Sequence, residues 1–268
     1  MKIKTSKSKI NCKSFFEKDT SVPYFFLHGF TGSYKSWIEI INLLSKKSFA
    51  IDITGHGKSI FLNINDEYTV NDWCNEFYLL LNSLSVEKIN LCGYSMGGRL
   101  AIAFASMYPK KINSLILEST SVGIDESEKR SERYYSDIAL AETIKDNINS
   151  FCREWSNNAL FSNQKKRNRQ EWANQKIIRN SHVPEQLSKS LLTFSPSNMI
   201  YYEKNFQEFN FNISIINGSE DDKFIKIGKD MTLMNKNAKQ YIVKDCNHNT
   251  HLESPGLFID ILNETIYE

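Results

Sequence analysis

The hydrophobic and polar positions of the chain follow an alternating rhythm up to residue 120 and again after residue 211. Short apolar runs, which indicate buried strands, are separated by longer stretches with apolar residues at helical spacing. This alternation is typical of strand–helix–strand units, so it predicts an α/β fold with a mostly parallel sheet flanked by helices. The predicted strands are 22–27, 49–53, 89–92, 112–117, 213–217 and 240–243, and the predicted helices are 34–44, 70–84, 96–108, one from about Phe224, and 255–267.

Residues 121–211 break this rhythm, because they are polar, charged and aromatic at helical spacing and contain no convincing strand. A strand pattern resumes after them, which indicates that the core closes around an insertion. We interpret residues 1–120 and 212–268 as an α/β core and residues 121–211 as an inserted helical cap.

Composition and charge narrow the class of protein. With 268 residues and 41% hydrophobic content, the chain can bury a full core as one large domain or as a domain with an insertion. The 33 basic and 31 acidic residues leave a formal charge of +2, which favours neither nucleic acid nor a membrane surface as a partner. The five scattered cysteines contain no C-x-x-C pair, which indicates reduced thiols rather than disulfides or a zinc site.

The start of the chain bears on location. Residues 1–7 lack the apolar core of a signal peptide, and no apolar stretch is long enough to span a bilayer. We therefore expect a cytoplasmic protein without membrane insertion. We also expect a monomer that takes a small-molecule substrate.

The segment 91–98 carries the strongest candidate chemistry. It places Ser95 between Gly93 and Gly97 at the point where an apolar run becomes a helix. A chain that turns this sharply strains its central residue, and the residues two positions away must lack side chains to let strand and helix pass. The serine hydroxyl would then lie above the sheet edge, beside the first helical N–H groups. We expect a catalytic serine; the alternative is an ordinary tight turn between strand and helix.

A serine hydroxyl becomes reactive when a histidine takes its proton and a carboxylate orients that histidine. In a parallel sheet, such groups lie on loops at the carboxyl ends of strands. The loop after the first strand that follows the cap offers Asp221, with Asp222 as the alternative. The loop after the last predicted strand offers His248, with His251 as the alternative. The order serine, acid, histidine is expected on this architecture, so we predict a triad of Ser95, Asp221 and His248.

The loop 28–32 follows another predicted strand and contains two glycines. Unencumbered N–H groups in such a loop can form half of an oxyanion hole, which stabilises negative charge in a transition state. We expect the N–H groups of Phe30 and Met96 to form this hole; the alternative is a plain glycine turn. The turn 55–59 lacks the spacing of a phosphate-binding loop, so nucleotide binding is not expected. The other histidines are interpreted as loop-packing or surface residues: His28, His56 and His182.

These motifs together resemble the α/β-hydrolase superfamily, and the resemblance covers most of the chain outside the cap. A narrower resemblance is to the 2-succinyl-6-hydroxy-2,4-cyclohexadiene-1-carboxylate (SHCHC) synthases of menaquinone and phylloquinone biosynthesis. Thr54 and Asn247 depart from the hydrolase pattern, which commonly has proline and glycine there. The superfamily match rests on 26–32, 55–59, 93–99 and 248–255, and the narrower one on Tyr94, Arg99, 128–133 with Asp137, Trp155 with 160–161, and Asp221 with 223–224.

The resemblance implies an α/β-hydrolase fold with a helical cap, and an elimination rather than a hydrolysis. In that reaction 2-succinyl-5-enolpyruvyl-6-hydroxy-3-cyclohexene-1-carboxylate loses pyruvate and becomes SHCHC. Ser95 would act as the base toward a proton beside a ketone, with His248 activating it and Asp221 orienting the histidine. Collapse of the resulting enolate requires no metal and no organic cofactor. Two other functions stay open: a hydrolase of esters or vinylogous carbon–carbon bonds, and a non-catalytic ligand receptor on the same fold.

The implied substrate carries three carboxylates, so cations should line its pocket, and arginine suits carboxylates best. Arg99, one helical turn beyond the candidate serine, is the first candidate; the alternative is a structural pair with a core acid. Arg130 and Arg133 share a face of the first cap helix. The alternative for that helix is a solvated face with the i,i+4 pairs Glu126–Arg130 and Arg133–Asp137. The other substrate-binding candidates are Tyr94, Trp155 and Arg179.

Overall fold

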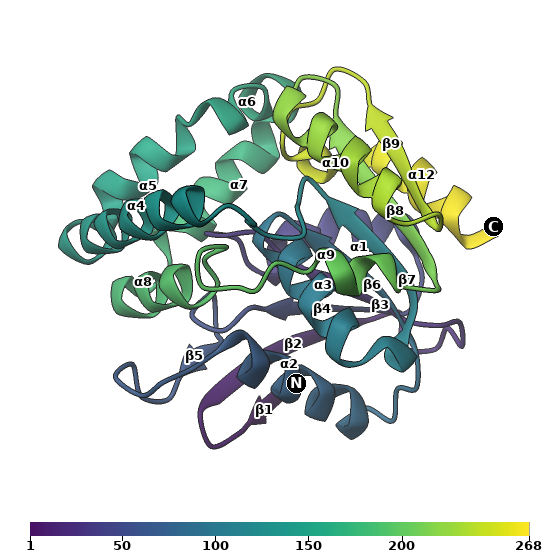
Figure 1. Cartoon of the computed structure of the whole chain (residues 1–268), viewed down its shortest axis with the longest axis horizontal. Coiled ribbons are helices and arrows are strands. Elements are labelled where there is room, and N and C mark those ends of the chain that lie inside the picture. Colours follow the sequence, from purple (N-terminus) through teal and green to yellow (C-terminus); the bar gives the residue numbers. More distant parts are fainter. Residues whose placement is uncertain (268) are drawn as a thin grey trace.

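A nine-stranded, mostly parallel sheet forms the centre of the molecule (Figure 1). The computed structural model describes residues 1–267, with side chains up to residue 264, so Glu268 of the predicted core lies outside the described residues. Neighbouring strands from β4 to β9 run parallel, whereas the strands at the other edge pair antiparallel. The strand order is β1 (Lys2–Lys4), β2 (Ser8–Phe15), β4 (Ser48–Asp52), β3 (Tyr24–Leu27), β6 (Ile89–Tyr94), β7 (Ile112–Glu118), β8 (Asn212–Gly218) and β9 (Ala238–Val243), with β5 (Ile60–Phe61) paired to β2.

All the strands that the sequence predicts are confirmed, with ends that shift by one or two residues. The edge strand β1, its neighbour β2 and the short β5 are not predicted by the apolar pattern, and β1 and β2 show why. Lysine, serine and asparagine occupy most of their positions, and the buried apolar side chains Ile10 and Cys12 alternate with polar ones. Such alternation is typical of an antiparallel strand that buries one face, and it leaves no apolar run to detect.

Helices cover both faces of the sheet. One face carries α1 (Ile38–Leu44), preceded by a 3-10 turn at Tyr34–Trp37, and α12 (Pro255–Tyr267). The other face carries α2 (Val70–Ser83), α3 (Met96–Met107) and α10 (Asp222–Met234). The short helix α11 (Thr250–Glu253) leads into α12. Of the helices in residues 1–267, none combines the length and the apolar character needed to cross a membrane.

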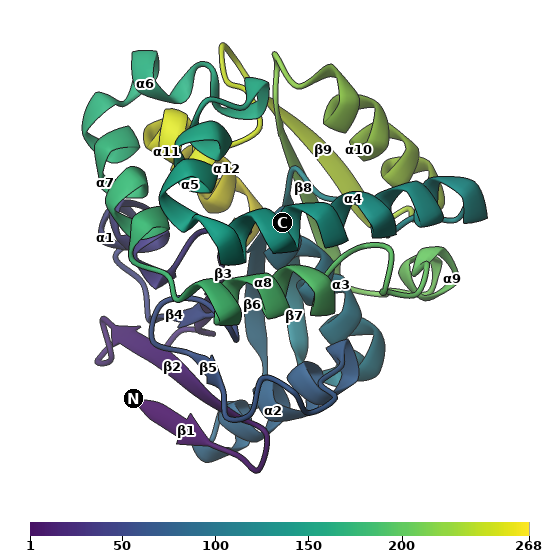
Figure 2. The ribbon, with the colours of Figure 1, turned by 90° about the vertical axis from the view of Figure 1, so that its left-hand side faces the viewer.

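The cap contains helices and no strand, as predicted, and all of residues 121–211 are described. Figure 2 shows its long helix α4 beside α8, the two running across the front of the sheet. Residues before Phe194 pack around an apolar cluster of their own, whereas aromatic side chains from Phe194 to Phe211 join the main core. The cap helices are α4 (Ser127–Asp146), α5 (Ile148–Ser156), α6 (Gln164–Arg167), α7 (Arg169–Asn180), α8 (Pro184–Thr193) and α9 (Glu203–Gln207), with a 3-10 turn at Ala159–Phe161.

Candidate active site

Ser95 occupies a strained turn between β6 and α3. Its φ of 51° and ψ of −107° lie in a region that residues with side chains rarely adopt. A Cβ on Gly93 would lie 2.5 Å from the carbonyl oxygen of Gly97, and a Cβ on Gly97 would lie 2.4 Å from the carbonyl oxygen of Leu27. Both contacts are too close to exist, so the two glycines are required where the spacing predicts them. The Oγ of Thr120 donates to the carbonyl of Ser95 at 2.8 Å and helps to hold the turn.

The structure brings Ser95, His248 and Asp221 together at the carboxyl edge of the sheet. His248 Nε2 lies 3.3 Å from Ser95 Oγ, and His248 Nδ1 lies 2.7 Å from Asp221 Oδ2. The other oxygen of Asp221 caps α10 by accepting the N–H of Phe224 at 3.3 Å. Asp221 and His248 are 4% and 3% exposed, so their contact is shielded from water. The arrangement matches a serine, a general base and an orienting acid.

Neither alternative residue contacts the serine. Asp222 is exposed in the first turn of α10. The ring of His251 instead lies 2.6 Å from the carboxylate of Glu118 and stacks on Trp37 with ring centroids 3.9 Å apart. Asp221 and His248 are therefore the acid and histidine placed at Ser95.

Phe30 and Met96 line the same space as Ser95. Met96 is the first residue of α3, so its N–H has no acceptor within the helix. In the part of the chain that the structure describes, neither N–H donates to another residue. The loop around Phe30 is held by the N–H of Thr31, which donates to His56 Nε2 at 3.2 Å. Both amides are thus available to an oxyanion, as the loop and helix start predict.

A cavity of about 160 Å³ lies between the triad and the cap. Ser95 and His248 border it from the core, and Trp155 borders it from the cap. Arg99 and Arg133 also line it, and the described residues of the lining include no aspartate or glutamate. The cavity therefore joins a nucleophile or base to a cationic wall. Tyr94, Phe161 and Lys223 also line this cavity.

Arg99 is a partly buried cation that forms no ion pair with a described acid. Its Nε is shielded from solvent and has no hydrogen-bond partner, and no described acid lies within ion-pair distance of it. Burial lowers the pKa of Arg99 to about 9; the charge of Arg133 adds to this effect and the charge of Asp137 opposes it. The side chain is still cationic at neutral pH. The alternative of a structural pair with a core acid is thus not what the structure contains.

The three cap arginines proposed as substrate ligands, Arg133, Arg130 and Arg179, have different surroundings. Arg133 lines the cavity and pairs with Asp137 at 2.8 Å, the i,i+4 pair that the sequence indicates. Arg130 is not among the lining residues described for this cavity; it donates to the carbonyl of Ile124 at 2.5 Å. The expected Glu126–Arg130 pair is wrong, because the carboxylate of Glu126 contacts Lys129.

Arg179 is 3% exposed and borders a separate space of about 20 Å³ together with Tyr94. It donates to Ser156 Oγ at 2.9 Å and lies 4.7 Å from the ring centre of Phe161. Burial lowers its pKa to about 10, so it too is cationic at neutral pH. The structure does not bring Arg179 into the main cavity, although Tyr94 and Phe161 border both spaces.

His28, His56 and His182 are buried rather than on the surface. They form a line of ring contacts, and His182 from the cap lies 2.9 Å from the carbonyl of Thr31 in the oxyanion loop. Burial lowers the pKa of His28 and His182 to about 4 and also lowers the pKa of His56 well below its usual value, so all are neutral at pH 7. They pack the loop, as expected, and join it to the cap.

The sequence interpretation missed Glu118, whose carboxylate is fully buried at the end of β7. The available signal was an acid directly after the apolar end of the predicted strand 112–117. Among the described residues, no group of three or more His, Cys, Asp or Glu side chains is placed to hold a metal ion. The five cysteines are buried free thiols.

Comparison with known proteins defines the family. The model of the α/β-hydrolase fold matches residues 23–255, so the chain belongs to the α/β-hydrolase fold family. A Bacillus subtilis protein provisionally named SHCHC synthase is 32% identical over 244 residues, which cover 89% of this chain and 88% of that protein. Within the fold family, the chain thus belongs to the SHCHC synthase family, and both resemblances that the sequence indicates are confirmed.

Two further proteins agree with this placement. The SHCHC synthase of Klebsiella pneumoniae is 26% identical, over 90% of this chain and 92% of its own length. The structure of MenH from S. aureus superposes with a TM-score of 0.88 at 25% identity, over 98% of each chain.

Proposed function

We propose that this protein is an SHCHC synthase, a carbon–oxygen lyase that eliminates pyruvate from 2-succinyl-5-enolpyruvyl-6-hydroxy-3-cyclohexene-1-carboxylate. The observation that carries the proposal is Arg99, a partly buried cation without an ion pair among the described residues, in the cavity that Ser95 and His248 also line. A substrate with three carboxylates supplies the charge that Arg99 lacks. The names of the relatives support the same reaction.

The mechanism uses Ser95 as a base. His248 Nε2 accepts the proton of Ser95 Oγ while Oγ removes the ring proton beside the succinyl ketone. Asp221 accepts the Nδ1 proton of His248 in a hydrogen bond and stabilises the imidazolium. The C–H electron pair moves into the ketone, and the enolate oxygen is held by the N–H groups of Phe30 and Met96.

The enolate then collapses. Its electrons form the C2–C3 double bond, the ring double bond shifts from C3–C4 to C4–C5, and the C5–O bond to the enolpyruvyl group breaks. The proton held by His248 and Ser95 is available to the leaving enolpyruvate, which becomes pyruvate. No acyl-enzyme forms and no water is consumed, which separates this reaction from ester hydrolysis by the same triad.

The cationic wall gives the substrate its orientation. We assign carboxylate contacts first to Arg99 and Arg133, which line the cavity, with Tyr94 and Trp155 as neighbouring walls. Arg130 and Arg179 are weaker candidates, because their guanidinium groups are engaged with Ile124 and Ser156 outside this lining. The monomeric state, the cytoplasmic location and the cap boundaries at residues 121 and 211 stay predictions.

The test is pyruvate release from the enolpyruvyl substrate, followed through a lactate dehydrogenase couple, beside turnover of p-nitrophenyl acetate. We expect pyruvate release with negligible esterase activity, and a loss of about a thousandfold in kcat for Ser95→Ala with an unchanged melting temperature. Robust esterase activity without pyruvate would establish the hydrolase alternative. Specific binding of the substrate without turnover of either compound would establish the receptor alternative.

A further inference from the structure

Glu118 lies between the strands that carry the catalytic residues. It ends β7, whose neighbours are β6, leading into Ser95, and β8, leading into Asp221. It pairs with Tyr94, the residue before Ser95, in the sheet register. Its exposed fraction is 0%, so whatever its carboxylate does is done inside the protein.

The backbone and the side chain of Glu118 hold different parts of the site. Its carbonyl accepts the N–H of Ser95 at 2.9 Å. One carboxylate oxygen accepts the Thr250 hydroxyl at 2.7 Å and the His251 backbone N–H at 3.0 Å, and the other lies 2.6 Å from His251 Nδ1. Thr250 begins the helical turn that follows His248 by two residues. One buried residue thus contacts both the serine turn and the histidine loop.

The ring of His251 is held by its Nδ1 and by its neighbouring rings, whereas its buried Nε2 has no hydrogen-bond partner among the described residues. It stacks on Trp37 with the ring planes 14° apart and meets Tyr94 edge-on, with centroids separated by 5.1 Å. Its Nδ1 donates to Glu118, and it is 1% exposed. Because Tyr94 is bonded to Ser95 and also packs against His248 at 5.4 Å, this stack connects the same two segments a second time.

We propose that Glu118 and His251 are positioning residues that set the distance between Ser95 Oγ and His248 Nε2. The inference rests on the proposed catalytic use of Ser95 and His248. Asp221 fixes the rotation of the His248 ring, whereas Glu118 fixes where the loop that carries this ring lies above the serine turn. Proton transfer depends steeply on that separation, so a displacement of about 1 Å costs on the order of a hundredfold in rate.

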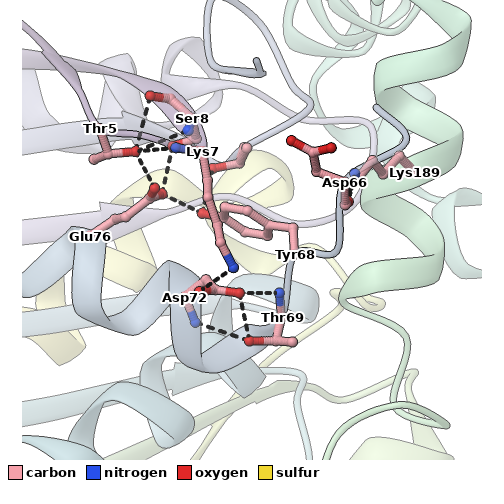
Figure 3. A network of polar contacts seen from close by, with 10 residues as sticks. Thr5, Lys7, Ser8, Asp66, Tyr68, Thr69, Asp72, Glu76 and Lys189 are labelled. Atoms are coloured by element: carbon pink, nitrogen blue, oxygen red, sulfur yellow. Dashed lines mark hydrogen bonds and ion pairs between the residues drawn. The ribbon is translucent and has the colours of Figure 1, made fainter. Parts of the chain in front are cut away.

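The chain offers a matched control in Glu76 of α2. Its carboxylate is buried, with 6% exposure, and it accepts hydroxyl groups from Thr5, Ser8 and Tyr68 (Figure 3). Figure 3 shows these side chains converging on it from the turn between β1 and β2, from β2 and from the segment before α2. Glu76 and Glu118 therefore each hold three hydrogen-bond donors, but the described partners of Glu76 belong neither to the serine turn nor to the loop that carries His248.

The test compares Glu118→Gln, Thr250→Val and Glu76→Gln with the wild type. A glutamine amide accepts through one oxygen only. It can accept from Thr250 and from the His251 N–H, but its NH₂ group then faces His251 Nδ1, which could pair with it only if the ring proton moved to Nε2. Three quantities are measured: the melting temperature, kcat and KM for pyruvate release, and the rate at which a fluorophosphonate labels Ser95. Labelling reports on the Ser95–His248 pair whatever the natural substrate is.

We expect Glu118→Gln to lower kcat and the labelling rate by between about tenfold and a hundredfold, with KM within about twofold. Thr250→Val removes one donor and should lower both rates by about threefold. Glu76→Gln should lower the melting temperature as Glu118→Gln does and leave both rates unchanged.

Equal rates in Glu118→Gln, Thr250→Val and wild type would overturn the proposal and leave Glu118 with a purely stabilising role. A parallel loss of rate in Glu76→Gln would overturn it too, because any buried carboxylate would then have the same effect. If the wild type is labelled but releases no pyruvate, the proposed function fails, and the labelling rates of the three variants still decide this inference.

Discussion

Ser95, His248 and Asp221 satisfy one another across the edge of the sheet, whereas Arg99, on the first turn of the adjoining helix, has no acid beside it. The side chains of the triad form hydrogen bonds with one another. On the arginine side, a partly buried cation forms no ion pair within the described residues, and only the more distant charge of Asp137 favours its charged form. Removing such a charge from water is costly in a folded protein. The positive charge of Arg99 is explained if a ligand with a negative charge binds in the cavity and pairs with it.

A buried acid close to the triad shows the opposite case. Glu253 has no cation within ion-pair distance among the described residues, and its carboxylate accepts the N–H of Asn247 at 2.8 Å. Burial raises the pKa of Glu253 to about 7, and the nearby charge of Glu118 adds to this effect. An unpaired acid that faces the interior can thus be neutralised by a proton. An arginine cannot shed its charge so easily, so Arg99 depends on an anion from outside the chain.

The comparison predicts that Arg99 serves activity at the expense of stability. Replacing Arg99 with methionine keeps most of the side-chain length and removes the charge. We expect kcat/KM for pyruvate release to fall by about tenfold to a thousandfold, because a charged hydrogen bond contributes roughly 1.5–3 kcal/mol. The melting temperature should stay the same or rise, since a partly buried cation without an ion pair is removed.

Steady-state kinetics and thermal unfolding of Arg99→Met check this expectation, with Arg99→Lys as the control that restores a positive charge without the planar fork. Lysine should recover part of kcat/KM. Unchanged kinetics in the methionine variant, or a marked loss of stability, would place Arg99 among structural residues and remove the contrast with the triad.

The parts of the site that the sequence predicts are those set by local geometry. Glycine on both sides of Ser95 is demanded by backbone contacts within a few residues, so the turn can be identified from spacing alone. His248 and Asp221 follow predicted strands, and parallel strands bring their carboxyl ends to one edge. The strand ends were accordingly placed to within two residues.

The remaining features depend on contacts between distant segments. The carboxylate of Glu118 meets a turn more than a hundred residues later, as the separation of 132 positions to Thr250 shows, and no local pattern records that. Arg130 and Arg133 share a helix face in sequence, but the packing of α4 on α8 decides which of them borders the cavity. The strands β1 and β2 were missed because polar residues dominate them.

The substitution Glu253→Gln tests whether this interior acid is neutralised by a proton. A carboxyl group whose pKa rises on folding, here from 4.5 to about 7, takes up a proton on folding between those pH values. The free energy of unfolding of the wild type should therefore fall as the pH rises through that window, by about 1–3 kcal/mol from this group. Glutamine keeps the acceptor for Asn247 and does not ionise.

Urea unfolding at pH 5 and pH 8 measures the effect. The glutamine variant should match the wild type at the lower pH and exceed its stability at the higher pH by about 1–3 kcal/mol. A pH-independent difference between the two proteins would mean that Glu253 does not titrate in this range, and that an interior acid here is stabilised by some means other than protonation.

The smallest expected effect separates the two arginines of α4. Arg133→Ala removes a cation from the cavity wall, whereas Arg130→Ala removes one whose guanidinium donates to the Ile124 carbonyl. Because Arg133 already shares its charge with Asp137 and is partly exposed, its loss should lower kcat/KM by about tenfold, less than the loss of Arg99. Arg130→Ala should change kcat/KM by less than about twofold. Measuring both at matched ionic strength isolates position from charge, since each variant lowers the net charge equally. Equal losses would mean that the cap helix acts through its total charge, and the distinction between a cation that borders the cavity and one that does not would no longer hold.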